Sequence, residues 1–327
     1  MRKNKFWVVA TVALLIAALA LTGCSQSTDT KKAATKYPEK AITTIAFTGP
    51  GGGSDLFNRQ SGKALQNILG KPVVTENRVG GSGAVAMQNA ADAKPDGYTL
   101  MGVTNTLLIT PIRNTTPKSM NDFIPIARLV LDPLVVYVRA DSKYDSEKFV
   151  DAIKNGDGSL KVACSQAGSP ETISMETLVK KYNGKIHMVP YPDSSKAMPA
   201  VLGGDVDAGM GELAELIPQL EAKTIKIVMA LTSKRVPSHP DVPTFVEKGY
   251  TDVSVDKFRG WAAPKGTPPE IIKILEDACK KSLEDAEYKQ TIAKNYQVPA
   301  FLGSEDFGKF LKETEDKYRA YFGAQKK

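Results

Sequence analysis

The sequence has 327 residues, of which 42% are hydrophobic and 24% are charged, and its formal net charge is +7. These fractions are typical of a soluble globular protein. The basic residues are scattered or paired rather than gathered into runs, which argues against a nucleic-acid-binding surface. With two histidines, three cysteines and no zinc-type spacing, the chain is expected to hold neither a metal nor a cofactor.

The chain begins with a basic tip and an uncharged apolar run from Phe6 to Leu21, which small residues and Cys24 follow. An apolar stretch this short, with small residues at its end, predicts a secretory signal over residues 1–23. Thr-Gly directly before Cys24 resembles the lipobox of bacterial lipoproteins. This resemblance implies that Cys24 is acylated and anchors the mature chain to the bilayer, on the cell surface or in the periplasm. An uncleaved transmembrane anchor is the alternative, and it too leaves the remaining chain outside the cytoplasmic membrane.

Residues 24–36 are rich in Ser, Thr, Lys and Ala, so they cannot bury enough apolar surface to fold, and they predict a flexible tether. The remaining length is sufficient for two domains of ordinary size. After acylation of Cys24, Cys164 and Cys279 remain. Two cysteines so far apart form no disulfide framework, and we interpret both as free thiols.

From residue 37 onward, short apolar runs alternate with amphipathic stretches, a pattern typical of α/β architecture. Three strand–helix units in succession imply a mainly parallel sheet covered by helices. The expected strands are 42–48, 73–77 and 98–103, with helices over 54–69 and from the glycines 80–83 to about 93.

An apolar stretch over 127–138, broken by Asp132-Pro133, predicts two extended segments, the second of which leaves the first sheet. A second α/β series follows, and a later extended segment at Trp261 is expected to cross back. We therefore expect an α/β fold with two lobes and a ligand cleft between them, which is the architecture of a hinged solute receptor. A two-domain α/β enzyme has the same layout. The expected divisions are 37–138 and 256–327 for lobe 1, and 139–255 for lobe 2.

A glycine-rich loop, Gly51-Gly52-Gly53-Ser54-Asp55, follows the first strand and opens a helix. Glycines let the backbone approach a ligand, and the first N–H groups of the helix can bind a carboxylate or phosphate. Open α/β sheets bind ligands beyond the carboxyl ends of their strands. The Walker pattern is absent, because no lysine follows these glycines until Lys63. The dinucleotide pattern is absent too, so we disfavour a nucleotide. A turn without any ligand is the other interpretation.

A second loop, Ser165-Gln166-Ala167-Gly168-Ser169, lies between a strand and a helix of the second series. Two such loops across one cleft could each bind one carboxylate of a dicarboxylic or larger acid, through backbone amides and hydroxyls and without lysine or arginine. Thr104-Asn105-Thr106 and Gly209–Glu212 are expected at equivalent sheet edges.

From Tyr37 to its end, the chain resembles the solute receptors of tripartite tricarboxylate transporters, often called Bug-type receptors. Several collinear motifs carry the resemblance. They are Tyr37-Pro38-x-Lys40, Gly49–Asp55, Pro72–Arg78, Pro95–Leu100, Val189–Tyr191, Leu202–Asp207, Thr232–Arg235, Asp241–Thr244 and Gly266–Pro268.

The resemblance implies a type II periplasmic-binding-protein fold, capture of a small organic carboxylate, and partnership with the permease subunits of a tripartite transporter. We expect a monomer. Pro192-Asp193, Gly209–Gly211 and Gln166-Ala167 depart from the usual family residues near the cleft, so the ligand could differ from familiar ones. The candidate binding residues are Gly51, Gly52, Gly53, Ser54, Asp55, Thr104, Asn105, Ser165, Gly168, Ser169, Tyr191 and Asp207.

Two other functions were weighed. A serine hydrolase lacks support because no Gly-x-Ser-x-Gly elbow occurs and only His187 or His239 could serve as a base. No catalytic residue is therefore assigned. A lipoprotein that senses a ligand for a membrane signalling partner cannot be separated from a transport receptor by sequence.

Overall fold

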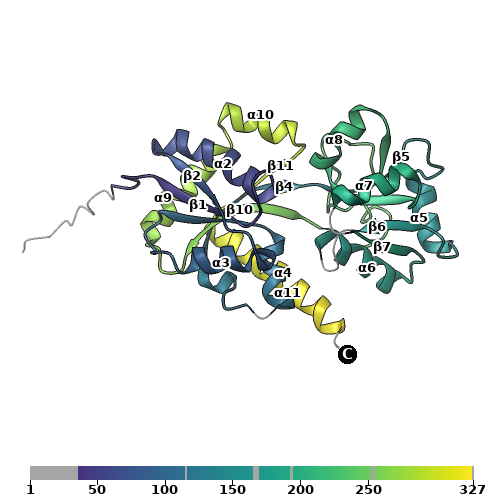
Figure 1. Ribbon diagram of the computed structural model, residues 1–327, viewed down its shortest axis with the longest axis horizontal. Coiled ribbons are helices and arrows are strands. Elements are labelled where there is room, and N and C mark those ends of the chain that lie inside the picture. Colours follow the sequence, from purple (N-terminus) through teal and green to yellow (C-terminus); the bar gives the residue numbers. More distant parts are fainter. Residues whose placement is uncertain (1–35, 115, 165–168, 192–193, 252–254, 326–327) are drawn as a thin grey trace, which may run out of the picture. The chain divides into compact units, whose positions relative to one another are not determined.

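The computed structural model describes residues 36–114, 116–164, 169–191, 194–251 and 255–325. The predicted signal over residues 1–23, with Cys24, and all but the last residue of the predicted tether lie outside the described residues. The described part of the chain contains two β-sheets, each covered by helices (Figure 1). We call the first sheet with its helices lobe 1, and the second sheet with its helices lobe 2.

The first sheet has six strands in the order β11-β4-β10-β3-β1-β2. As predicted, β1 pairs in parallel with both β2 and β3, whereas β10 runs antiparallel to β3 and β4. The carboxyl ends of β1 and β3 therefore meet at one edge of this sheet. The bounds are β1 (Ile42–Ala46), β2 (Val73–Asn77), β3 (Thr99–Val103), β4 (Phe123–Asp132), β10 (Lys257–Pro264) and β11 (Val298–Leu302).

Helices cover both faces of the first sheet. On one face, Phe57 of α2 shares a buried cluster with Leu275 of α9; on the other, Leu107 of α4 and Phe307 of α11 belong to a second cluster. The helix α2 ends at Leu69, as predicted, because the C-cap residue Gly70 adopts a left-handed conformation that glycine tolerates. The helices are α2 (Gly53–Leu69), α3 (Ala84–Ala91), α4 (Asn105–Arg113), α9 (Pro269–Ser282), α10 (Ala286–Lys294) and α11 (Ser304–Gln325), with short 3₁₀ turns η1 (Gly81–Gly83) and η2 (Met120–Asp122).

The second sheet has five strands in the order β7-β6-β8-β5-β9. Its two faces carry separate buried clusters, one with Phe149 of α5 and Leu178 of α6, the other with Val201 of α7 and Leu216 of α8. The elements are β5 (Leu134–Arg139), α5 (Ser146–Asn155), β6 (Lys161–Cys164), α6 (Pro170–Tyr182), β7 (His187–Pro190), α7 (Ser194–Gly203), β8 (Ala208–Glu212), α8 (Leu213–Glu221) and β9 (Ile225–Ala230).

The first crossing between the sheets is a single residue, Pro133, between Asp132 at the end of β4 and Leu134 at the start of β5. A proline suits this position because it lacks the N–H that a continuous strand would need for pairing. The predicted break at Asp132-Pro133 is confirmed. On sheet membership, however, lobe 2 begins at Leu134, earlier than the expected division after Val138, because β5 pairs with β8 and β9.

Several elements differ from expectation. The first strand ends at Ala46 rather than at residue 48, and the helix α4 was not predicted; α10 and β11 were also missed. The edge position of β11 in the first sheet explains how a strand can contain Pro299, since an edge strand tolerates a missing N–H. The side chain of Asp285 caps α10 by accepting a hydrogen bond from the N–H of Tyr288.

Candidate functional site

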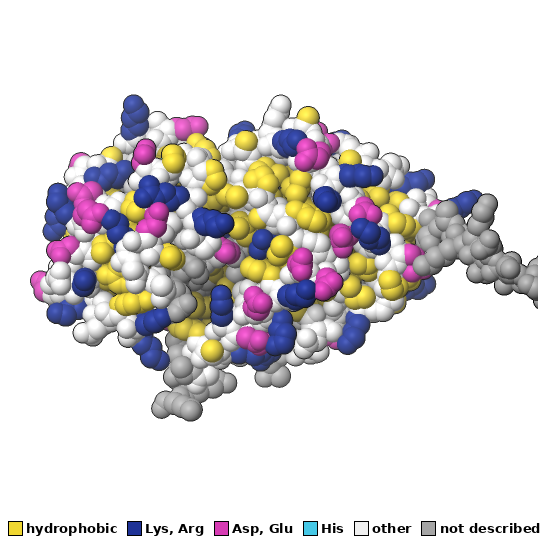
Figure 2. Space-filling view, turned by 180° about the vertical axis from the view of Figure 1, so that it is seen from behind, with side chains coloured by type: hydrophobic (Ala, Val, Ile, Leu, Met, Phe, Trp, Pro, Cys, Tyr) yellow, Lys and Arg dark blue, Asp and Glu magenta, His cyan; other side chains and the backbone are white. Residues whose placement is uncertain are grey.

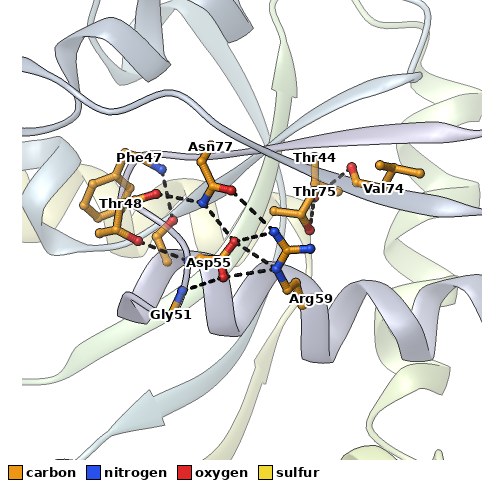
Figure 3. Close-up of polar contacts among 10 residues, drawn as sticks. Thr44, Phe47, Thr48, Gly51, Asp55, Arg59, Val74, Thr75 and Asn77 are labelled. Carbon is orange, nitrogen blue, oxygen red and sulfur yellow. Dashed lines mark hydrogen bonds and ion pairs between the residues drawn. The ribbon is translucent and has the colours of Figure 1, made fainter.

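The loop between β1 and α2 is closed by the buried carboxylate of Asp55 (Figure 3). This carboxylate accepts hydrogen bonds from the N–H of Gly51 at 2.9 Å and from Asn77 Nδ2 at 2.8 Å, and it pairs with Arg59 Nη2 at 2.9 Å. Burial disfavours the charged form, but the hydrogen bonds from Arg59, Gly51 and Asn77 outweigh it and lower the pKa of Asp55. Asp55 therefore shapes the loop, and its oxygens are directed at the protein's own donors.

The helix α2 starts in this loop without a side-chain cap. Gly52 is its N-cap residue in an extended conformation, and the hydroxyl of Ser54 accepts the N–H of Phe47 at 3.3 Å instead of capping the helix. Gly51 and Gly53 are exposed. The N–H groups of Gly51 and Gly52 already donate to Asp55 and to the carbonyl of Gly49, and the N–H of Asp55 donates to Thr48 Oγ1. The first N–H groups of a helix have no intrahelical acceptor, so the donors that this turn offers a ligand are those of Gly53 and Ser54.

The helix α4 begins at the same sheet edge, directly after β3. Its N-cap residue Thr104 is extended and makes no side-chain cap, and the buried Thr104 Oγ1 has no hydrogen-bond partner among the described residues. Since β1 and β3 are parallel neighbours, the first turns of α2 and α4 lie at one edge. The structure thus brings Thr104 to the same edge as the glycine loop.

Asn105 is fixed by the second crossing segment and by the C-terminal helix. Its Oδ1 accepts the N–H of Phe258 at 3.0 Å, and its Nδ2 donates to the hydroxyl of Tyr318 at 2.8 Å. Asn105 also lines a cavity of about 430 Å³ together with Pro170 and Ser174 from the first turns of α6. This volume lies within the ordinary range of ligand pockets, roughly 300–1,000 Å³.

Of the second-lobe candidates, Ser165 and Gly168 lie outside the described residues. Ser169 is the N-cap residue of α6, and its hydroxyl accepts the N–H of Thr172 at 3.3 Å. Tyr191 is half-buried directly after β7, where its N–H donates to the carbonyl of Cys164 at 2.8 Å. Ser169 and Tyr191 therefore follow neighbouring strands, at the carboxyl edge of the second sheet.

Asp207 lies elsewhere. Its Oδ2 accepts the N–H of Lys161 at 2.8 Å, and its own N–H donates to the carbonyl of Lys161 at 2.9 Å. Lys161 begins β6, so Asp207 is at the amino ends of β6 and β8, opposite the edge that carries Ser169. The structure does not bring it together with the other candidates.

A buried ionic cluster at the crossings escaped the sequence analysis. Arg259 pairs with Asp132 and, at 3.1 Å, with Glu212, while Lys257 also pairs with Glu212. Burial disfavours the Glu212 carboxylate, but Lys257 and Arg259 lower its pKa to about 2. A signal was present, because Asp132, Lys257 and Arg259 interrupt otherwise apolar strand sequences. The expectation of a site without basic side chains did not consider them.

The free thiols and the surface charges complete the inventory. Cys164 and Cys279 are both free and buried, and Trp261 is fully buried against Phe57. Figure 2 shows Lys and Arg interspersed with Asp and Glu over the face drawn, without one dominant sign. No helix in the described ranges is long and apolar enough to cross a membrane.

Two α/β lobes joined by crossing strands, with a cavity that both lobes line, define a type II periplasmic-binding-protein fold. Residues 57–324 match the model of the tripartite tricarboxylate transporter family receptor, and the chain belongs to this family. It is thus an extracytoplasmic solute receptor rather than an enzyme.

Related proteins match this chain over most of its length. The chain is 29% identical over 325 residues to the UPF0065 protein in the gbd 5' region of Cupriavidus necator, covering 98% of this chain and 97% of the relative. It is 28% identical over 268 residues to protein BugT of Bordetella pertussis, covering 80% and 82%. A crystal structure of a TctC solute-binding protein from Polaromonas, without ligand, superposes with a TM-score of 0.77 at 28% identity, covering 88% and 99%.

Two further structures share the fold at 23% identity. They are MatC from Rhodopseudomonas palustris with bound malate, with a TM-score of 0.69 and coverage of 87% and 99%, and an R. palustris protein with adipate, with a TM-score of 0.74 and coverage of 87% and 97%.

Proposed function

We propose that this protein is a lipid-anchored receptor that binds a small organic carboxylate between its lobes and presents it to the membrane subunits of a tripartite tricarboxylate-type transporter. The observation that carries the proposal is the cavity lined by Asn105 of lobe 1 together with Pro170 and Ser174 of lobe 2. Asn105 follows Thr104, and Pro170 follows Ser169, so the cavity adjoins these two candidates; helix α11 forms much of its wall, and the glycine loop does not line it. The malate and adipate bound by two proteins of the same fold support a dicarboxylate.

The chemistry of the edge suits such a ligand. The first turns of α2 and α4 offer backbone donors, and hydrogen bonds to a charged group contribute about 1.5–3 kcal/mol each. Four to six such donors would contribute about 6–18 kcal/mol, a range that includes the roughly 8 kcal/mol of micromolar binding. We place the hinge at Pro133 and near residue 256. Closure requires only that the ligand bind the closed state more tightly than the open state.

The test is a thermal-shift screen with malate, adipate and citrate, followed by calorimetry, with a neutral sugar and a polyamine as controls. A true ligand raises the melting temperature by mass action, and we expect this from at least one carboxylate. A rise with the sugar or the polyamine, and with none of the acids, would contradict the proposal.

A loop variant tests where the acid binds. A Cβ at Gly52 would lie 2.6 Å from Thr48 Oγ1, so Gly52→Val should displace the loop and weaken binding without unfolding the protein. Gly49→Val is the matched control, because a Cβ there meets nothing within 4 Å. If Gly52→Val bound the acid as tightly as Gly49→Val does, the loop would not belong to the binding site.

The lipid anchor needs its own experiment, since Cys24 lies outside the described residues. We expect Cys24→Ser to leave the protein in the soluble fraction after cell fractionation, whereas the unchanged chain stays with the membrane. Continued retention of the variant would favour an uncleaved transmembrane anchor.

A further inference from the structure

The guanidinium of Arg259 lies against the first residue of α2. A Cβ built on Gly53 would be 2.9 Å from Arg259 Nη2 and 3.3 Å from Nη1, closer than side-chain atoms normally approach. Only glycine leaves room for the guanidinium here. Arg259 is buried, whereas Gly53 is exposed. A permanent positive charge is therefore located beside Gly53, the first residue of α2.

Three segments hold this guanidinium in place. Its Nε donates to Asp132 at the end of β4, and its Nη2 donates to Glu212 at the start of α8, at 3.1 Å. The other oxygen of Asp132 accepts a hydrogen bond from Gln297 Nε2 at 2.7 Å. These contacts use Nε and Nη2, so the guanidinium keeps one orientation, with both Nη2 and Nη1 near Gly53.

The cluster also balances its own charge. Lys257 and Arg259 contribute two positive charges, and Asp132 and Glu212 contribute two negative charges. These four groups sum to no net charge when all are ionised, although burial raises the pKa of Asp132 and the buried Glu171 also interacts with Lys257. The placement of Arg259 nevertheless adds its cation to the positive end of the α2 helix dipole, and these two like charges favour an anion at that point.

We propose that Arg259 determines the specificity of the first-lobe site for a carboxylate, by adding a fixed positive charge to the backbone donors of the Gly51–Asp55 loop. The inference rests on the proposed function and deepens it. The loop then recognises an anion through charge as well as through hydrogen bonds, and a neutral amide or ester of the same acid should bind poorly. Lys257 pairs with the same glutamate without contacting Gly53, so it offers a matched comparison.

The experiment measures dissociation constants by calorimetry for the acid, malate or adipate, that binds the unchanged protein more tightly. Arg259→Met should weaken binding about tenfold or more, as expected for the loss of one charge-assisted interaction, and Arg259→Lys should recover part of the loss. Lys257→Met should lower the melting temperature but keep the affinity within about threefold. Full affinity in a folded Arg259→Met variant, or an equal loss in Lys257→Met, would overturn the inference.

Gly53→Ala provides a second route if Arg259→Met does not fold. The added methyl group shifts the guanidinium while every charge remains, so we expect weaker binding and a fall in melting temperature smaller than that of Arg259→Met. Unchanged affinity would again overturn the inference alone. Failure of the unchanged protein to bind any acid would overturn both this inference and the proposed function.

Discussion

Two carboxylate–guanidinium networks flank the first-lobe loop, and they are built in opposite ways. Asp55 and Arg59 are four residues apart on one helix, and the Arg59 side chain is 52% exposed. Arg259 is 127 residues from Asp132 and 47 from Glu212, and its side chain is 7% exposed. The first network organises one turn of chain, whereas the second joins three distant segments of the fold.

This difference in exposure determines how much each network should contribute to stability. Water screens an exposed pair, so its loss costs about 0–1 kcal/mol. Removing one partner from a buried pair leaves an uncompensated charge in a medium that cannot solvate it, which costs about 3–5 kcal/mol. The buried cluster at the crossings is therefore expected to dominate stability, and the loop network to act mainly on loop shape.

Glu212→Gln provides the largest test of this contrast. The change leaves Lys257 and Arg259 without one of their two carboxylates, so we expect the free energy of unfolding at neutral pH to fall by about 3–5 kcal/mol. Urea unfolding measures it. Glu221→Gln, at an exposed position near the end of α8, is the matched control and should change little. A fall of less than 1 kcal/mol in the free energy of unfolding of Glu212→Gln would contradict the expected difference between the two networks.

The same residue predicts a pH dependence. The pKa of Glu212 is about 2 in the folded protein, against 4.5 for an ordinary glutamate, so the unfolded chain takes up its proton first as the pH falls. The stabilisation by Glu212 is therefore complete above pH 4.5 and is lost as the pH falls toward 2. The stability of the unchanged protein should thus fall more steeply than that of Glu212→Gln over this range, which thermal unfolding at stepped pH can measure. If stability fell in parallel with pH for the two proteins, the charge of Glu212 would not contribute to the stability of the cluster.

The contrast also explains what the sequence could reveal. The strand–helix alternation, the break at Pro133 and the cap at Gly70 depend on residues close together in the chain, and all three were predictable. The Asp55–Arg59 spacing belongs to the same local class. Arg259 could not be paired with Asp132 or Glu212 by any pattern, because only the sheet order β4-β10 and the packing of lobe 2 bring them together.

The site residues show the same difference between features set by local sequence and contacts made across the fold. Thr104 and Asn105 were predicted because they end a strand at the expected edge, a property of local sequence. The hydrogen bond between Asn105 and Tyr318, which are 213 residues apart, could not be predicted. Asp207 shows the converse: it belongs to a family motif and was a candidate, but β8 begins only after it, at Ala208, and this places it at the amino edge.

Asp55→Asn sharpens the comparison at the loop. An amide at this position would turn donor hydrogens toward the N–H of Gly51 or the amide of Asn77, so we expect a loss of about 1–3 kcal/mol in the free energy of unfolding. Because the loop carries the proposed donors, affinity for the acid should fall too. Calorimetry on the folded variant measures this. Unchanged affinity would show that the loop keeps its shape without this carboxylate.

Arg59→Ala should have the smallest effect, and this makes it the most direct test of the local network. The carboxylate of Asp55 keeps the N–H of Gly51 and the amide of Asn77 when Arg59 is removed, and alanine suits a helix interior at least as well as arginine. We expect the free energy of unfolding to change by less than about 1 kcal/mol, with unchanged affinity for the acid. A loss as large as that of Glu212→Gln would mean that Arg59, although half-exposed, supplies the charge that keeps Asp55 ionised. The exposure of a guanidinium would then be a poor guide to its importance in this fold.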